Sequence, residues 1–396
     1  MDAVEVKLPA HEYQVTIGAG ALGHVAPFLT SLTSGLKSSA QHAFVIADSG
    51  VPRSFVDSMV REIDSAGCEV RVATLTPSEQ EKSIETTHGL LKQVALSGHT
   101  RSDPIIVIGG GVVGDIAGFV AASYQRGVPV IQCPTTLLSM VDASVGGKTG
   151  VNLSVESPAG ERSLLKNLVG AFHQPRAVFA DIDVLESLEE RYRISGLAEC
   201  VKHGMIGAGV GARHAGLMDW MIEHCDSIRA FDPATIQELV VRNVAIKADV
   251  VVDDERESIE AKAGGRMLLN FGHTFGHAVE TIGHLSPDSN RPDLAPLHHG
   301  EAVALGMMAA CNAALSAGRC EQIVVDGLKK VLEAFQLPAQ VSGLPTTSEV
   351  VERMSHDKKV SGKALRVILP TGWGKCEIVN DPDPQWIADG IDSIRA

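Results

Sequence analysis

The chain has 396 residues, and its 34 Lys and Arg against 48 Asp and Glu give a formal net charge of −14 at pH 7. A protein that coats nucleic acid needs a basic face to displace counterions from phosphates, so this acidic average excludes a general polyanion binder. With 44% hydrophobic and 21% charged residues, the composition indicates a soluble globular protein with a sizeable core. The length predicts about two to three domains.

Cysteine usage and the N-terminal segment bear on the compartment. The seven cysteines are odd in number and form no CxxC pair, which argues against a disulfide framework and against a structural zinc knuckle. Residues 1–18 have neither a basic segment before an apolar run nor the Arg and Ser bias of a transit peptide. No stretch approaches about 20 uninterrupted apolar residues. We therefore expect a cytoplasmic protein with reduced thiols, no membrane span and no nucleic-acid partner.

The first half of the chain alternates between strand-like and helix-like segments. Short runs rich in Val and Ile predict strands at 14–18, 43–48, 68–75, 104–110 and 128–134. Helix-periodic segments lie between them, at 54–67 and 83–98. This alternation predicts a parallel sheet with crossover helices, an arrangement that often binds nucleotides.

From about residue 184 the chain becomes rich in Ala and Val and helix-periodic. Helices are predicted at 186–208, 217–252, 266–284, 300–317 and 322–336, with almost no strand signal before 365–370. Two segments with much Pro, Ser, Asn and charge, 154–163 and 286–296, are predicted to be exposed loops. We expect an α/β domain over residues 1–183 and a helical domain over residues 184–396.

Two glycine-rich turns are candidates for binding anions. GGGVVG at 109–114 satisfies GxGxxG between a predicted strand and a predicted helix, where glycines let the backbone approach a pyrophosphate. This fingerprint places an acid about 20 residues later, which is missing here, although Asp48 ends an earlier strand; a dinucleotide site and a plain tight turn both stay open. GGKT at 146–149 lacks P-loop spacing, because Asp142 stands where that pattern needs glycine. Lys148 is then either an anion ligand or a solvated loop lysine.

Three histidines and a glutamate form a candidate metal site. His273 and His277 are four residues apart and share one helical face, but the sequence HTFGH lacks the glutamate of HExxH metalloproteases. His299 opens a predicted Ala-rich helix. Glu199 stands with Lys202 on an apolar segment, where a buried charge needs a partner. Two histidines with one carboxylate are a frequent set for a catalytic divalent metal, so we favour a metal at His273, His277, His299 and Glu199.

Eight sequence blocks occur together and in order. They are SEQEK (78–82), GGGVVGD (109–115), the stretch 124–152, KNLVGAFHQP (166–175), GLAECVKHG (196–204), LLNFGHTFGHAVE (268–280), HGEAVALGM (299–307) and DKK (357–359). Together they resemble the 3-dehydroquinate synthase family of the sugar phosphate cyclase superfamily, over roughly residues 40–375. The resemblance implies an N-terminal Rossmann-like α/β domain with a parallel sheet that binds NAD. It further implies an all-α C-terminal domain that carries zinc or cobalt, and a homodimer.

The resemblance also implies roles for individual residues. The implied metal ligands are Glu199, His273 and His299, which leaves His277 as a substrate or proton-relay contact. The implied NAD contacts are Asp48, Glu79, Lys82, Gly110, Gly111, Asp115, Thr135, Thr136, Asp142 and Lys166. The implied substrate contacts are Arg126, Asp142, Lys148, Asn167, Lys202, Lys247, Glu257, Arg266, Asn270, His277 and Lys358. Most of this last set is cationic, which suits a substrate that carries both a carboxylate and a phosphate.

The reaction implied by the resemblance converts 3-deoxy-D-arabino-heptulosonate 7-phosphate to 3-dehydroquinate and phosphate, a step of the shikimate pathway to aromatic amino acids. NAD would take a hydride from C5, phosphate would leave by β-elimination, the hydride would return, and an intramolecular aldol reaction would close the ring. The metal would polarise the C4 and C5 oxygens. NAD would thus be regenerated in every turnover.

Three other functions compete with this one. Another sugar phosphate cyclase would be expected to change the residues that read the substrate carboxylate, but Lys247, Asn270 and His277 match the dehydroquinate pattern. A metal-dependent polyol dehydrogenase would not need so many cations, and an inactive NAD-binding scaffold would be expected to lack a ligand or lysine. The main departures from the family pattern are two longer segments, 154–163 and 258–265, whose roles the sequence does not define.

Overall fold

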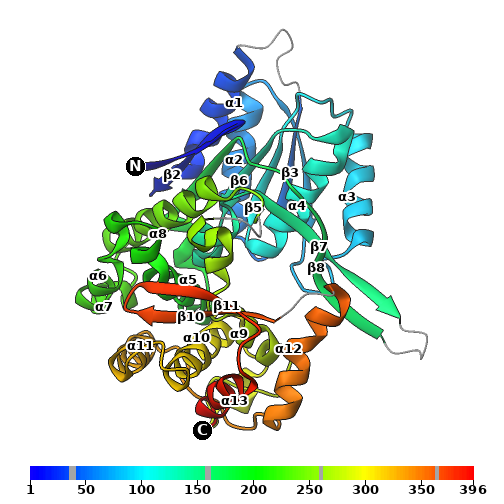
Figure 1. The fold of residues 1–396 in the computed structure, drawn as a ribbon. Helices are drawn as coiled ribbons and strands as arrows, with labels where there is room; N and C mark the ends of the chain where they lie inside the picture. Colours follow the sequence, from blue (N-terminus) through cyan, green and yellow to red (C-terminus); the bar gives the residue numbers. More distant parts are fainter. Residues whose placement is uncertain (35–41, 157–161, 258–261, 362–364) are drawn as a thin grey trace. The chain divides into compact units, whose positions relative to one another are not determined.

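The computed structural model describes residues 1–34, 42–156, 162–257, 262–361 and 365–396, with side chains except at 33–34, 162–163, 262–264 and 355–361 (Figure 1). The chain divides into two compact units, each made of two segments. Met1–Glu189 with Ile236–Ala248 form the first, here called the sheet unit, and Glu190–Thr235 with Asp249–Ala396 form the second, the helical unit. The expected division of the chain into two domains after residue 183 stays a prediction.

A seven-stranded sheet organises the sheet unit, with the strand order β1-β2-β9-β6-β5-β3-β4. The strands are β1 Asp2–Leu8, β2 His11–Gly18, β3 His42–Asp48, β4 Glu69–Leu75, β5 Ile105–Gly109, β6 Val130–Pro134 and β9 Ala177–Asp181. Every neighbouring pair is parallel except β1 with β2. The mainly parallel sheet is therefore confirmed, and β2 to β6 coincide with the five predicted strands. The sequence analysis did not predict β1 and β9.

Helices connect the parallel strands of this sheet. They are α1 Val25–Ser34, α2 Arg53–Ser65, α3 Ile84–Leu96 and α4 Gly111–Ser123. Helix α1 packs beside α2, and α3 packs beside α4. The main core of the unit lies where α3 and α4 cover β3 and β5, and it includes Ile46, Leu90, Ile105 and Ile116. Strands β5, β6 and β9 are buried along their whole length, as expected for central strands of a parallel sheet.

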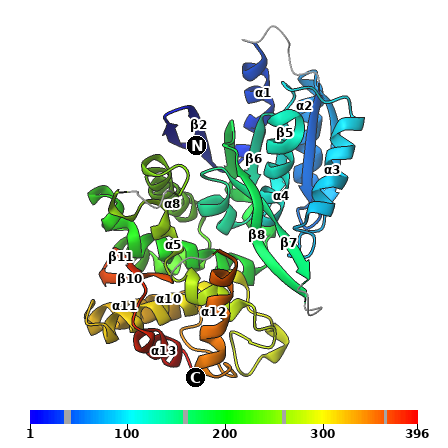
Figure 2. The ribbon, with the colours of Figure 1, turned by 45° about the vertical axis from the view of Figure 1, so that its right-hand side comes forward.

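An antiparallel hairpin also belongs to the sheet unit, formed by β7 Lys148–Glu156 and β8 Arg162–Phe172 (Figure 2). The loop prediction for 154–163 is therefore wrong at both ends, and residues 157–161 lie outside the described residues. The alternation of β7, KTGVNLSVE, is a strand pattern that the Pro and Ser content nearby obscured. The two strands approach closely at Gly170, where an added Cβ would lie 2.1 Å from the Thr149 carbonyl oxygen.

The helical unit holds most of the predicted helices. Its helices are α5 Glu190–Val210, α6 Leu217–Glu223, α7 Cys225–Arg229, α9 His273–Glu280, α10 His299–Ser316, α11 Gln322–Ala334, α12 Thr347–Ser361 and α13 Pro384–Ser393. Helix α8 Pro233–Asp253 is shared by the two units. The long helix predicted at 217–252 is broken into α6, α7 and α8. The break before α8 arises because Asp232 caps α8 through the Thr235 N–H and Phe231 has a φ of +53°.

The helical unit is not purely helical, since β10 Arg366–Gly372 and β11 Lys375–Asn380 form an antiparallel hairpin. The strand predicted at 365–370 falls on β10. Helix α10 lies at the centre of the unit and packs against α5, α9 and α13. Its approach to α9 is close, since an added Cβ at Gly306 would lie 2.0 Å from the Gly272 carbonyl oxygen.

Short helices and one exposed loop complete the fold. The short helices are η1 Ala21–His24, η2 Tyr124–Arg126, η3 Ser139–Ala143, η4 Ile182–Ser187, η5 Ala212–His214, η6 Lys262–Asn270 and η7 Pro292–Leu294. The loop predicted at 286–296 is mostly exposed and contains η7. Among the described residues, no helix is long and apolar enough to cross a membrane.

Candidate active site

The glycine turn lies at the carboxyl end of β5, where parallel sheets usually bind their ligands. Gly110 precedes α4 and Gly111 is its first residue. An added Cβ at Gly109 would lie 2.9 Å from the Asp48 Cβ, and one at Gly110 would lie 3.2 Å from Thr136 Cγ2. The structure therefore brings Asp48, the glycine turn and Thr136 together at neighbouring strand ends. Glycines at the start of a helix allow an anion to approach the backbone N–H groups there.

A second group of proposed NAD contacts surrounds a partly buried ion pair. Lys82 Nζ donates to Asp115 Oδ2 over 2.5 Å, and the Lys82 side chain is 7% exposed. Burial raises the pKa of the Asp115 carboxyl, and the Lys82 ammonium opposes that rise. Glu79 lies near Lys166, with 4.0 Å between Oε2 and Nζ. Lys166 comes from the β7–β8 hairpin, so the hairpin and the turn before α3 contribute to one cluster.

The other candidate residues of the sheet unit lie in different settings. Lys247, on the part of α8 that belongs to this unit, pairs with Asp142 of η3. Thr135 is buried, and its N–H donates to the Gly109 carbonyl. Lys148 is exposed at the start of β7. Arg126 is exposed too, with a φ of +66°, a backbone conformation that non-glycine residues seldom adopt.

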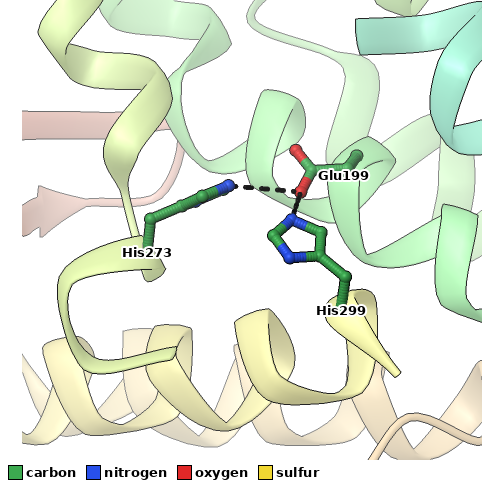
Figure 3. A group of neighbouring side chains, drawn as sticks. All are labelled: Glu199, His273 and His299. Carbon is green, nitrogen blue, oxygen red and sulfur yellow. Dashed lines mark ion pairs between the residues drawn. The ribbon is translucent and has the colours of Figure 1, made fainter. Parts of the chain in front are cut away.

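Glu199, His273 and His299 converge in the helical unit (Figure 3). Glu199 lies on the buried part of α5, while His273 and His299 are the first residues of α9 and α10. Figure 3 shows both imidazole rings pointing at one carboxylate oxygen. The distances from Glu199 Oε1 are 3.5 Å to His273 Nε2 and 3.6 Å to His299 Nε2.

These three side chains fit a divalent metal ion. Ligand atoms about 2.0–2.1 Å from a tetrahedral zinc ion lie about 3.3–3.4 Å from one another, close to the separations observed here. Two imidazoles and one carboxylate are also a donor set that leaves a coordination position open for substrate. His277 belongs to a second group with Glu280 and His299, and its ring centroid lies 5.3 Å from that of His273. The two groups share His299 and form one connected cluster.

Outer contacts orient each of the three ligands. His273 Nδ1 donates to the Phe271 carbonyl over 3.2 Å, and His299 Nδ1 lies 3.5 Å from Glu280 Oε1. Each ring therefore presents Nε2 to Glu199, whose other oxygen pairs with Lys202. Such contacts fix the tautomer and direction of a metal-binding histidine.

The two imidazoles titrate differently in these surroundings. Burial lowers the pKa of His273 to about 3. Burial also opposes protonation of His299, but hydrogen bonds to the carboxylates of Glu199 and Glu280 outweigh it and raise the pKa of His299 to about 9. The carboxylates thus favour a positive charge at this position, as a metal-binding cluster requires. Sequence reasoning missed Glu280, although it follows His277 by three residues and so lies on the same side of α9.

The start of α10, which carries His299, is held against α5. Arg191 donates to both carboxylate oxygens of Glu301 over 2.8 Å. Glu301 Oε2 also accepts from the His298 N–H over 2.7 Å, which completes a capping interaction. The Gly300 N–H donates to Ser195 Oγ over 3.0 Å. These bonds fix the helix that carries Glu199 relative to the first turn that carries His299.

Among the other candidate residues of the helical unit, Asn270 and Glu257 contact each other. Asn270 Nδ2 donates to Glu257 Oε1 over 3.2 Å. Arg266 is buried and donates to the Glu255 carbonyl over 2.8 Å. Lys358 lies on α12, but its side chain is outside the described residues.

Two solved structures share the fold of this chain. 2-Deoxy-scyllo-inosose synthase, complexed with carbaglucose-6-phosphate, NAD+ and Co2+, has a TM-score of 0.77 and 23% identity, covering 98% of this chain and 99% of its own. ValA, a 2-epi-5-epi-valiolone synthase from Streptomyces hygroscopicus subsp. jinggangensis 5008 with NAD+ and Zn2+ bound, has a TM-score of 0.78 and 22% identity, covering 98% of both chains. The chain thus has the fold of the sugar phosphate cyclases.

Sequence comparison places the chain more narrowly. Family models described as 3-dehydroquinate synthase N-terminal and C-terminal match residues 72–195 and 196–360. The 3-dehydroquinate synthase of Aliivibrio fischeri (strain MJ11) is 36% identical over 100% of both chains. That of Halorhodospira halophila (strain DSM 244 / SL1) is 39% identical over 98% of both. The chain belongs to the 3-dehydroquinate synthase family.

Proposed function

We propose that this chain converts 3-deoxy-D-arabino-heptulosonate 7-phosphate to 3-dehydroquinate and phosphate, as a carbon–oxygen lyase (EC 4.2.3.4) of the shikimate pathway. The observation that carries the proposal is the identity of 36–39% to curated 3-dehydroquinate synthases over nearly the whole chain. The cyclases that make other rings are only 22–23% identical. The convergence of Glu199, His273 and His299 supports a metal-dependent activity.

The proposed cofactors are NAD, held in the sheet unit, and zinc or cobalt, held by Glu199, His273 and His299. When bound, the metal acts as a Lewis acid on substrate oxygens, and NAD accepts and returns a hydride. Within the sheet unit, the α4 N-terminus suits the pyrophosphate and Asp48 the ribose hydroxyls. Glu79, Lys82, Asp115 and Lys166 shape the neighbouring part of the nucleotide site.

The basic residues bind the two anionic groups of the substrate. In the sheet unit, Lys148 and Arg126 are exposed, so neither side chain has to leave a buried position in order to bind an anion. In the helical unit, Arg266 is held in the interior by its bond to the Glu255 carbonyl, which fixes its planar donor group for a carboxylate or phosphate. Asn270, oriented by Glu257, donates to a substrate oxygen.

His277 handles protons in this proposal. Its imidazole lies against the rings of His273 and His299, with centroid distances of 5.3 and 6.0 Å. It is not one of the three proposed metal ligands. An imidazole can accept or release a proton near neutral pH. His277 therefore carries a proton to or from the hydroxyl groups that react beside the metal cluster.

We also propose that the protein works in the cytoplasm as a homodimer, with a small phosphorylated sugar acid as its substrate and no nucleic-acid or membrane partner. The acidic net charge of −14 supports the exclusion of nucleic acid. Sedimentation of the purified protein tests the dimer, and a monomer at micromolar concentration would contradict it.

A substrate panel tests the proposed reaction. The zinc-loaded protein is given NAD and, in parallel, the heptulosonate phosphate or other phosphorylated sugars, and the products are identified by NMR. We expect 3-dehydroquinate and phosphate from the heptulosonate phosphate alone. A valiolone or inosose ring from another sugar would assign the chain to a different cyclase, and steady accumulation of NADH would indicate a dehydrogenase.

A further inference from the structure

Asn152, in the middle of β7, uses every polar group of its carboxamide. The residue is 2% exposed. Its Nδ2 donates to the backbone carbonyl and to Oε2 of Glu79, both over 2.9 Å. Its Oδ1 accepts from the Asn167 N–H over 2.9 Å, and its own N–H donates to the Lys82 carbonyl over 2.8 Å. One buried side chain thus connects three segments of the sheet unit.

The contact with Asn167 lies at an irregularity of the hairpin. Val151 pairs with Val169 and Leu153 with Leu165, so Lys166, Asn167 and Leu168 together face Asn152 alone. This arrangement is a β-bulge, which breaks the hydrogen-bond ladder and redirects side chains. Asn167 has a φ of +54°, a left-handed conformation that is uncommon outside glycine, although asparagine adopts it more often than most residues. Asn152 Oδ1 accepts a hydrogen bond from the Asn167 N–H in the bulge and so stabilises this conformation.

The contacts with Glu79 and Lys82 lie on the opposite side of Asn152, in the turn that precedes α3. The Lys82 N–H donates to the Ser78 carbonyl over 3.0 Å, which closes the turn. Lys82 then pairs with Asp115 of α4, and Glu79 faces Lys166 of the bulge. The turn and the bulge therefore meet at Asn152, and both carry residues that we assign to NAD.

We propose that Asn152 is a positioning residue for NAD: its carboxamide holds the Glu79–Lys82 turn and the Lys166–Asn167 bulge in one fixed arrangement. This inference rests on the proposed function, which assigns Glu79, Lys82 and Lys166 to the nucleotide. Asparagine suits the position because the site needs two donors toward Glu79 and one acceptor toward Asn167. Aspartate has the same shape but no donor, and it would place a second carboxylate beside that of Glu79.

The test compares Asn152→Asp with a matched control on the same strand, Ser154→Ala, whose side chain is exposed. NAD binding to the zinc-loaded proteins is measured by calorimetry without substrate, and the kinetics are measured with it. Loss of the two buried donor bonds is expected to raise the Kd for NAD by about tenfold or more in Asn152→Asp. The KM for NAD rises by a similar factor, while kcat at saturating NAD changes less. Ser154→Ala keeps the wild-type Kd.

The outcomes separate this inference from the proposed function. Wild-type NAD affinity in a folded Asn152→Asp variant overturns the positioning role and leaves the function in place. A wild-type protein that binds no NAD overturns both. If the variant does not fold, hydrogen exchange on the wild type decides: the Asn167 amide should exchange far more slowly than in an unstructured peptide, and rapid exchange would overturn the inference.

Discussion

Replacement of Glu199 by Gln is expected to destabilise the helical unit strongly and to remove its metal affinity. Glu199 and Lys202 form an ion pair in which both side chains are only 1% exposed. Removing one member of a buried pair costs about 3–5 kcal/mol, because the remaining charge loses its partner without regaining water. Glutamine keeps the shape of the side chain, so the expected loss comes from the charge rather than from a cavity.

A second variant, Lys202→Met, separates the ion pair from the metal site. It is expected to cost a similar free energy in the metal-free protein, because it leaves the Glu199 carboxylate buried without its ammonium. All three proposed metal ligands remain, however, and a divalent ion beside the carboxylate replaces the lost positive charge. Zinc should therefore restore the stability of Lys202→Met by mass action, but should not stabilise Glu199→Gln.

Tryptophan fluorescence during urea unfolding measures these effects selectively. The three tryptophans of the chain, Trp220, Trp373 and Trp386, all lie in the helical unit. The free energy of unfolding is compared between metal-free and zinc-loaded protein for each variant. Asp293→Asn, which breaks an exposed ion pair in the same unit, serves as control and should leave the free energy of unfolding close to that of the wild type. A Glu199→Gln protein that is as stable as this control, or that zinc stabilises like the wild type, would refute the reasoning.

Three further predictions concern other parts of the chain. Glu280→Gln weakens the orientation of His299 and should lower zinc affinity by about tenfold in a chelator competition; an unchanged affinity would contradict that role. Burial lowers the pKa of His99, so the unfolded chain binds more protons and wild-type stability is lost as the pH falls through the unfolded value of about 6.5. His99→Gln should remove this part of the loss, which urea unfolding at several pH values measures. A difference in free energy of unfolding between wild type and variant that stayed the same at every pH would contradict the prediction. Gly170→Ala should destabilise the sheet unit by steric conflict across the hairpin, whereas Gly89→Ala, which has open space on α3, should stabilise it by about 0.5–1 kcal/mol; circular dichroism during unfolding checks both, and equal stabilities would count against the packing argument.

Local pattern predicted those elements whose burial follows from their own sequence. Strands β3 and β5 are short apolar runs that lie between other strands of the sheet, and α2 and α3 have a clear helical period, so each was predictable. Strand β9 was not, because its sequence AVFAD has one β-branched residue where the equally short β5, IIVIG, has four. Its place between β2 and β6 also depends on distant pairing. The β7–β8 hairpin was missed in part because its turn composition extended the predicted loop into the strands.

In the candidate site too, contacts within one helix were predictable from spacing, whereas contacts between distant segments were not. The spacing of Glu199 and Lys202 predicted their pairing, since residues three apart share one side of a helix. The approach of His273 and His299 to Glu199 joins three separate helices. The residue types alone indicated a metal at these three residues together with His277, and the family resemblance then separated His277 from the ligands. Asn152 escaped notice because its role depends on the register of a bulge, which spacing along the chain does not reveal.

The number of turnovers per NAD molecule is the decisive measurement for a cyclase that regenerates its NAD in each catalytic cycle. Zinc-loaded protein is incubated with excess 3-deoxy-D-arabino-heptulosonate 7-phosphate and a limiting amount of NAD, and phosphate and 3-dehydroquinate are counted. We expect the two products to form in equal amounts and in large excess over NAD, with no lasting NADH. One NADH for each product molecule, or no release of phosphate, would contradict it.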